Sequence, residues 1–219
     1  MQGGWFVYYQ SRQGTDSAFP YRGIARLGFC LVCCLLAPAF AFADTAPWPD
    51  FRGPYANGHV RAPGDATPVN LPTQWSETEN VVWKTPIPHK GWSSPVVWGD
   101  QIWLTTATEE GNDFFVIALD TNSGAVLHNK QLFHSDDPEP LGNAVNCYAS
   151  PSAAIEEGRV YVHFGSYGTA CLETTTGEVL WQRDDLPCQH YRGPGSSPIL
   201  FEDSLILTFD GIDQQYLTA

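Results

Sequence analysis

The stretch that decides the fold covers residues 91–130 and reads GWSSPVVWGDQIWLTTATEEGNDFFVIALDTNSGAVLHNK. It returns, shortened and altered, as YASPSAAIEEGRVYVHFGSYGTACLETTTGEVLWQRD over residues 148–184. It begins a third time as GSSPILFEDSLILTFDGIDQQYLTA over residues 195–219. The Ser-Pro pairs that begin at Ser94, Ser150 and Ser197 mark the three copies, at steps of 56 and 47 residues. Repeats of this length, built from short strands, are typical of the blades of a β-propeller.

Each complete copy predicts four short antiparallel strands joined by tight turns. An acidic residue four positions before a glycine, as in Asp120 to Gly124 and Glu173 to Gly177, predicts an Asx-type turn before the fourth strand. The fold class we expect is therefore an all-β propeller of four-stranded antiparallel blades, incomplete, with about two and a half blades present. The predicted strands cover residues 96–98, 101–106, 114–119 and 125–130 in the blade at about 92–130; residue 155 and residues 159–164, 169–172 and 178–183 in the blade at 148–184; and residues 199–201 and 204–209 in the truncated blade at 195–219.

Around these turns the sequence resembles the repeat of the PQQ-like (quinoprotein-type) β-propeller family. The matching segments are Ala118–Gly124 and Cys171–Trp181, which follow the pattern of an acidic residue, a glycine and a later tryptophan. The family includes PQQ-dependent alcohol dehydrogenases and a non-enzymatic lipoprotein of outer-membrane protein assembly. The resemblance implies that the closing tryptophan docks onto the neighbouring blade. Trp181 occupies that position in the second copy, whereas the first copy departs from the pattern with His128.

Residues 81–84, with Trp83, resemble a lone closing strand of the same family. In a closed propeller such a strand completes the last blade, so that no sheet edge is left open. Propellers close with about four to eight blades of roughly 40–50 residues. We therefore expect residues 81–219 to form part of a longer propeller, of which this chain is an N-terminal fragment.

The segment that precedes the repeats predicts export. Arg22 and Arg26 precede the apolar run Leu27–Ala37, and Ala41-Phe42-Ala43 ends the segment as a cleavage site. Residues 1–43 are thus a predicted signal peptide, and we expect a periplasmic or secreted protein with no transmembrane span after cleavage behind Ala43. A lipoprotein acylated at Cys33 or Cys34 is the weaker alternative. Residues 44–80 are a lead-in whose WPDFRGPYANG resembles the family segment that packs across the propeller.

Composition limits the kinds of partner. The 219 residues carry a formal charge of −13, which argues against nucleic-acid backbones and anionic lipid surfaces. The 8 Trp, 20 Gly and 17 Pro residues fit a fold of many short strands and turns. After cleavage three cysteines remain, Cys147, Cys171 and Cys188, either as one disulfide with a free thiol or as three small buried residues.

Blade topology places the loops between strands two and three, and those between blades, on one face around the central channel, here called the channel face. Function is expected on such loops because a rigid scaffold holds them. Arg192 with Lys90 suits a carboxylate or phosphate, and His190 with Asp210 or Asp213 suits an acid/base pair, although structural roles are the more common explanation. The ligand-binding candidates are His89, Lys90, Tyr167, His190, Arg192, Asp210, Asp213 and Gln214.

Oxygen ligands for calcium are offered by Asp136, Asp137 and Glu139, for which a solvated acidic loop is the ordinary explanation. PQQ and calcium follow from the family resemblance alone, and no catalytic residue can be assigned. In quinoprotein dehydrogenases adjacent cysteines hold PQQ, whereas Cys33-Cys34, the one adjacent pair here, lies in the predicted signal peptide.

The sequence therefore favours a non-catalytic binding module or scaffold. Its channel face is expected to bind a protein segment, a glycan or a small molecule. The alternative is a PQQ- and calcium-dependent dehydrogenase, a quinoprotein-type oxidoreductase whose active site lies largely outside the present sequence. A third hypothesis is a hydrolase or lyase that uses His190 with an aspartate of the third blade.

Overall fold

The computed structural model describes residues 5–9, as backbone only, together with residues 47–69, 71–142 and 144–219. The predicted cleavage site at Ala43 and the cysteines Cys30, Cys33 and Cys34 lie outside these residues, so the signal peptide remains a prediction. The described part contains strands, one short 3-10 helix and no α-helix. Within it, no helix is long and apolar enough to cross a membrane.

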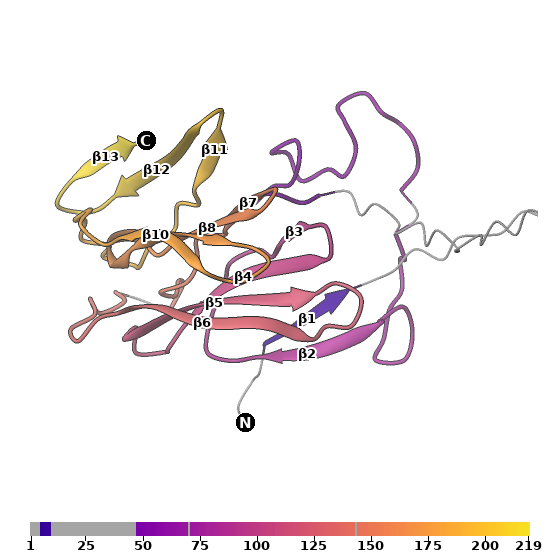
Figure 1. Ribbon diagram of the computed structural model, residues 1–219, viewed down its shortest axis with the longest axis horizontal. Coiled ribbons are helices and arrows are strands. Elements are labelled where there is room, and N and C mark those ends of the chain that lie inside the picture. Colours follow the sequence, from indigo (N-terminus) through magenta and orange to yellow (C-terminus); the bar gives the residue numbers. More distant parts are fainter. Residues whose placement is uncertain (1–4, 10–46, 70, 143) are drawn as a thin grey trace, which may run out of the picture.

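Antiparallel sheets follow one another along the chain and across the molecule (Figure 1). Two of them are complete four-stranded blades, which confirms the predicted fold class. The first blade contains β3 (Val96–Trp98), β4 (Gln101–Ala107), β5 (Asp113–Asp120) and β6 (Val126–His134). The second contains β7 (Ala154–Glu156), β8 (Arg159–His163), β9 (Thr169–Glu173) and β10 (Val179–Arg183), with the 3-10 helix η1 (Gly165–Tyr167) between β8 and β9.

The third sheet contains β11 (Ile199–Phe201), β12 (Ser204–Asp210) and β13 (Gln215–Thr218). The repeat pattern does not predict β13, which pairs along β12 from Asp210 opposite Gln215 to Leu207 opposite Thr218. Another difference is that β6 continues through residues 131–134, a segment that the sequence assigns to a loop. There the strand remains paired to β5, with Asp113 opposite His134.

Strand register corrects one of the landmarks used to align the repeats. The equivalent of Ser94 in the second blade is Ser152, two residues beyond the Ser150 of the Ser-Pro pair, because Trp98, Glu156 and Phe201 occupy the same place before each β-turn. Hydrogen bonds agree with this alignment: the Ser94 N–H donates to Ser152 Oγ at 2.8 Å, and the Ser152 N–H donates to Ser197 Oγ at 3.0 Å. The equivalent serines thus link each blade to the next.

The lead-in segment crosses the first strands of the two complete blades, as the resemblance implies. The backbone of Trp48 exchanges two hydrogen bonds with Val97 of β3, at 2.8 and 2.9 Å. One residue later, the carbonyl of Pro49 accepts the Ile155 N–H of β7 at 2.8 Å. β3 and β7 each lie at the edge of their sheet. These bonds pair backbone N–H and C=O groups on the side of each strand that has no neighbouring strand.

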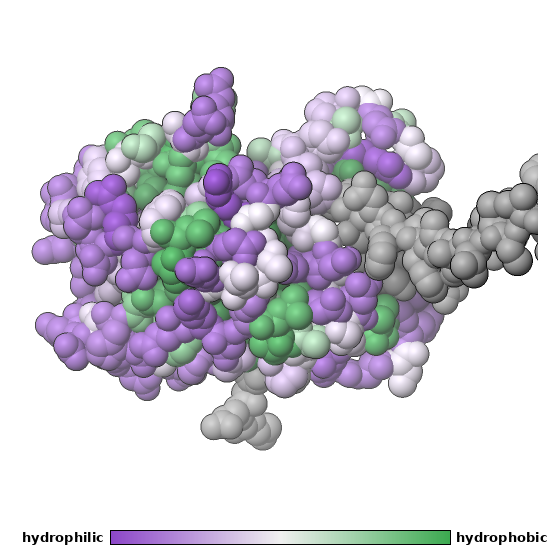
Figure 2. Space-filling view, viewed as in Figure 1, coloured by the Kyte–Doolittle hydropathy of each residue, from purple (hydrophilic) through white to green (hydrophobic). Residues whose placement is uncertain are grey.

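Faces of adjacent sheets bury the core. The largest cluster lies between the first and second blades and includes Trp103, Phe114, Phe164 and Leu172, each fully buried. A smaller cluster lies between the first blade and β2 (Trp83–Ile87). β2 pairs antiparallel with β1 (Trp5–Tyr9), a strand within the predicted signal peptide. In the third sheet Leu207 and Phe209 are buried, whereas hydrophobic residues remain exposed over its outer side, as Figure 2 shows.

Trp83 docks onto the first blade as the family resemblance implies for a closing strand. Its indole Nε1–H donates to the carbonyl of Thr121 at 2.9 Å, inside the turn that Asp120 begins. Gly124 ends this turn at φ 70°, where a Cβ atom would overlap the indole ring. Trp181 behaves differently: it contacts Tyr161 of its own blade and is 40% exposed.

Candidate functional site

Five loops of the channel face are joined to one another by hydrogen bonds, although they come from three sheets. Both the backbone and side chains contribute to this network. The linking pairs are Asn112 with Ser135, Tyr167 with Glu139, Ser166 with His190, Gly142 with Tyr191, and Ile212 with Gln189. Each loop of the channel face is therefore hydrogen-bonded to a neighbouring loop.

The long loop between the first two blades is fixed at its centre by two tyrosines. The Tyr167 hydroxyl accepts the Glu139 N–H at 3.0 Å, and the Tyr148 hydroxyl donates to the Glu139 carbonyl at 2.6 Å. The Tyr167 ring stacks on Phe114 with 4.6 Å between ring centroids. Burial raises the pKa of Tyr167 to about 12, so its hydroxyl stays neutral. Tyr167 therefore anchors the loop.

His190 is buried between the second and third sheets. Its Nε2 accepts the Ser166 N–H at 3.1 Å, and its Nδ1 lies 3.8 Å from the Sγ atom of Cys188. Burial lowers the pKa of His190, although the charges of Asp210 and Asp213 oppose this shift. With both ring nitrogens facing these partners, the ring holds two loops together, an arrangement that does not favour the predicted acid/base pair.

The acidic loop of the third sheet is engaged in the same structural network. Asp213 accepts the Gln189 N–H at 2.9 Å, which holds the pKa of its carboxyl below the ordinary value. Gln214 donates to the carbonyl of Pro187 at 2.8 Å. Asp210 is exposed at the end of β12. Two of these three candidates thus fix the loop that carries His190.

The two residues of the predicted basic pair each lie over an aromatic ring. Lys90 lies over the ring of Trp92, with its Nζ atom 5.8 Å from the ring centroid, while Arg192 lies over Tyr191 at 5.7 Å. His89 is exposed, adopts φ 64° and stacks on Phe115 at 4.3 Å. No contact joins Lys90 to Arg192 among the described residues. Each cation instead has its own aromatic neighbour, a typical cation–π geometry.

The three calcium candidates also diverge. Asp136 contacts His134, whereas the Glu139 carboxyl lies beside the backbone N–H of His190, and Asp137 is exposed. Partial burial raises the pKa of Glu139. Among residues 47–69, 71–142 and 144–219, no three His, Cys, Asp or Glu side chains are grouped as metal ligands. The donor set therefore does not fit a calcium ion, which needs six or more oxygens.

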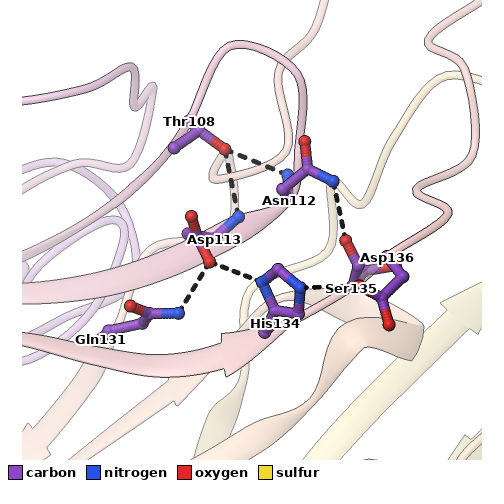
Figure 3. A network of polar contacts seen from close by, with 7 residues as sticks. All are labelled: Thr108, Asn112, Asp113, Gln131, His134, Ser135 and Asp136. Carbon is purple, nitrogen blue, oxygen red and sulfur yellow. Dashed lines mark hydrogen bonds and ion pairs between the residues drawn. The ribbon is translucent and has the colours of Figure 1, made fainter.

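Asp136 belongs to a polar network where the first blade meets the long loop, and the sequence analysis did not predict this network (Figure 3). At its centre, His134 Nδ1 is 2.7 Å from Asp113 Oδ1 and His134 Nε2 is 3.1 Å from Asp136 Oδ1. Gln131 also donates to Asp113, at 2.7 Å. The two hydrogen-bonded carboxylates raise the pKa of His134. The pairing of β5 with β6 places Asp113 opposite His134. The sequence would have predicted this contact only if the fourth strand had been extended from residue 130 to residue 134.

A pocket of about 580 Å³ lies between the lead-in segment and the entry to the third sheet, within the size range of small-molecule sites. None of the sequence-based candidates lines it. Its walls combine apolar residues and hydroxyl groups with one aromatic, one basic and one acidic side chain. They include Phe51, Arg52, Ser150, Ser196, Ser197 and Thr208.

The cysteines offer no PQQ contact of the kind that the family resemblance implies. Cys147, Cys171 and Cys188 are free and buried, so the disulfide alternative is not formed among them. Burial raises the pKa of Cys188 to about 11, which keeps the thiol protonated and unreactive. The described residues therefore do not fit PQQ held by an adjacent cysteine pair.

The fold and repeats define this chain as a PQQ-like β-propeller repeat protein. Residues 66–184, more than half of the chain, match the family described as outer membrane protein assembly factor BamB. The chain belongs to this family. No curated protein gives a significant match.

Three solved structures resemble the chain, each at 18% sequence identity. BamB from Moraxella catarrhalis aligns with 59% of this chain and 37% of its own, at a TM-score of 0.42. A europium-containing methanol dehydrogenase aligns with 53% of this chain and 20% of its own, at 0.41. Quinohemoprotein alcohol dehydrogenase from Comamonas testosteroni aligns with 59% and 19%, at 0.41. The chain thus spans well under half the length of these structures.

Proposed function

We propose that this protein is an exported, non-catalytic binding scaffold whose channel face takes a protein segment. One observation carries the proposal: the loops of this face are fixed by mutual hydrogen bonds, yet they expose large apolar side chains. Val145, Tyr191 and Ile212 come from three different loops and are 67%, 53% and 67% exposed. Tyrosine and arginine are enriched where proteins bind one another, and Arg192 lies over the Tyr191 ring.

Family membership supports a protein partner in the cell envelope. The family description names an outer-membrane assembly factor, and we extend envelope location and protein binding to this chain as part of the proposal. The predicted signal peptide supports a periplasmic or secreted protein. A net charge of −13 favours a partner with basic residues and disfavours nucleic acid. A glycan or small molecule is the secondary ligand class, for which the pocket of about 580 Å³ is the candidate site.

Site-specific photocrosslinking tests the proposal. A photoreactive phenylalanine analogue in place of Tyr191 should form a discrete adduct with a protein in the native host envelope. The matched control carries the analogue in place of Ser123, an exposed residue of the first acid–glycine turn, which should give no such adduct. Tyr191→Ala combined with Arg192→Ala should release the partner. Adducts of equal yield at both positions would contradict a binding role for the channel face.

The alternative is a PQQ- and calcium-dependent dehydrogenase. When bound, PQQ would supply the oxidising group, and the residues described here place no ligand set around it. Incubation of the protein with PQQ and calcium, followed by dye-linked oxidation of alcohols and sugars, separates the two functions. Turnover above that of free PQQ would replace the scaffold proposal with an oxidoreductase.

A further inference from the structure

The imidazole of His134 lies between two carboxylates at the start of the long loop (Figure 3). Its Nδ1 faces Asp113 on β5, and its Nε2 faces Asp136 in the loop, at 2.7 and 3.1 Å. A neutral imidazole has one N–H group, so it can donate to only one of the two oxygens. Both contacts are hydrogen bonds only when the ring carries two protons and a positive charge.

Within the part of the chain that the structure describes, the charged groups in contact with the His134 ring are two carboxylates. Asp113 and Asp136 are the charged groups that act on the ring, and both favour the imidazolium form. The neighbouring polar group, Gln131 on β6, is neutral and donates to the same Asp113 oxygen. The Asp113 side chain is 31% exposed and that of Asp136 is 100% exposed. Of the two carboxylates, Asp136 is therefore the one that is free to turn away.

The segment that this contact controls is short and well defined. Ser135 is fixed on one side by the Asn112 backbone and side chain, both at 2.8 Å. On the other side, Glu139 is held by Tyr148 and Tyr167. Between these two anchors, Asp136 is held by its hydrogen bond with His134. Loss of the second ring proton therefore acts on residues 136–138 without unfolding the rest of the loop.

We propose that His134 is a proton-operated clasp that holds Asp136 at low pH and releases it at high pH. In the protonated state the imidazolium neutralises part of the acidic corner formed by Asp113, Asp136 and Asp137. In the neutral state the Nδ1–H remains with Asp113, and the Nε2 lone pair repels the Asp136 carboxylate. Asp136 then turns to solvent, and the corner gains one unit of negative charge.

This device regulates the channel face, so its consequence for binding rests on the proposed function. A partner segment with basic residues should bind this corner more strongly as the pH rises through the pKa of His134. That pKa lies above the ordinary histidine value of about 6.5. The sign for stability is opposite: the contact contributes fully below the unfolded-state pKa and is lost as the pH rises through the folded-state pKa.

Two-dimensional NMR of the full chain between pH 5 and 9 tests the clasp without any partner. The backbone amide signals of Asp136 and Asp137 should titrate with the same pKa as the His134 ring. In His134→Gln these amide shifts should lose that transition. Asp136→Asn should lower the proton affinity of His134 roughly threefold to tenfold, because one carboxylate partner is removed.

The matched control is Asp137→Asn. It removes the same charge from the next residue, whose side chain does not contact the ring. Equal effects of Asp136→Asn and Asp137→Asn on the His134 titration would overturn the clasp and leave only a general electrostatic effect. Titration of the Asp136 amide independently of His134 would also overturn it. Both NMR measurements use the free protein, so they test the clasp alone. The crosslinking experiment tests the proposed function separately.

Discussion

Two junctions in this molecule achieve the same contact with different residues. Where β2 meets the first blade, Trp83 donates to the carbonyl of Thr121 at 2.9 Å and Thr85 donates to that of Gly124 at 2.6 Å. This is the docking that the family resemblance implies for a closing strand. A single aromatic residue there supplies both the packing surface and the hydrogen-bond donor.

The junction between the first and second blades lacks the tryptophan and divides its roles. The acceptors are equivalent, Thr174 and Gly177, but the donors are Gln101 Nε2 at 3.0 Å and Lys130 Nζ at 3.0 Å. The closing position holds His128, which packs on Gly177.

The indole that His128 does not supply comes from Trp103 on β4. Its ring stacks with that of His128 at 5.6 Å, and its Nε1–H donates to Gln101 Oε1 at 2.9 Å. The comparison teaches that the carbonyls of the acid–glycine turn are the fixed requirement, whereas the donor can come from another strand.

The largest effect should come from the displaced indole. Trp103 is fully buried, so Trp103→Ala leaves a cavity between two blades and an unsatisfied Gln101 oxygen. We expect a loss of about 3–5 kcal/mol in the free energy of unfolding, measured by urea denaturation with a spectroscopic probe of the β-sheets. Trp83→Ala at the half-buried first junction should cost less. Equal losses for the two variants would contradict the proposed difference between the junction at Trp83 and the junction at Trp103.

The turn glycines should produce the next effect. Gly124 and Gly177 adopt φ 70° and 67°, and a Cβ atom at either position would overlap Trp83 or His128. Alanine at either site should cost roughly 2–3 kcal/mol, from the left-handed backbone together with the overlap. Gly158 is the matched control, because it has φ 77° with open space around it, and Gly158→Ala should cost only about 1 kcal/mol. Thermal unfolding of the three variants measures the difference, which would vanish if packing against the turns were unimportant.

The smallest effect isolates the relay through Gln101. Gln101→Glu keeps an acceptor for Trp103 but removes the donor to the Thr174 carbonyl, and we expect a loss of about 1–2 kcal/mol. Gln101→Met removes both hydrogen bonds and should cost more. Chemical denaturation of both variants, alone and combined with Trp103→Phe, measures the coupling. Additive losses in the combined variants would mean that the two hydrogen bonds act independently and that no relay exists.

Much of the channel face could not be predicted from residue types. The pair Asp113 and His134 becomes a contact only through the register of β5 with β6, and the partners of His190, Ser166 and Cys188, are likewise set by tertiary packing. The repeat alignment likewise needed the structure, since Ser150 and Ser152 both fit the entry to a strand by sequence. Strand register and the hydrogen bonds from Ser94 and to Ser197 select Ser152.

The sequence by itself determined the family, the four-stranded repeat, the positions of most strands and the acid–glycine turns. These features depend on local backbone preferences and on alternation along a strand, which neighbouring residues specify. The tertiary structure alone decided which donor serves each turn, which histidine lies between carboxylates and which candidate side chains hold loops together. Those outcomes depend on strand register and on packing between sheets, where residues far apart in the chain come within hydrogen-bond distance.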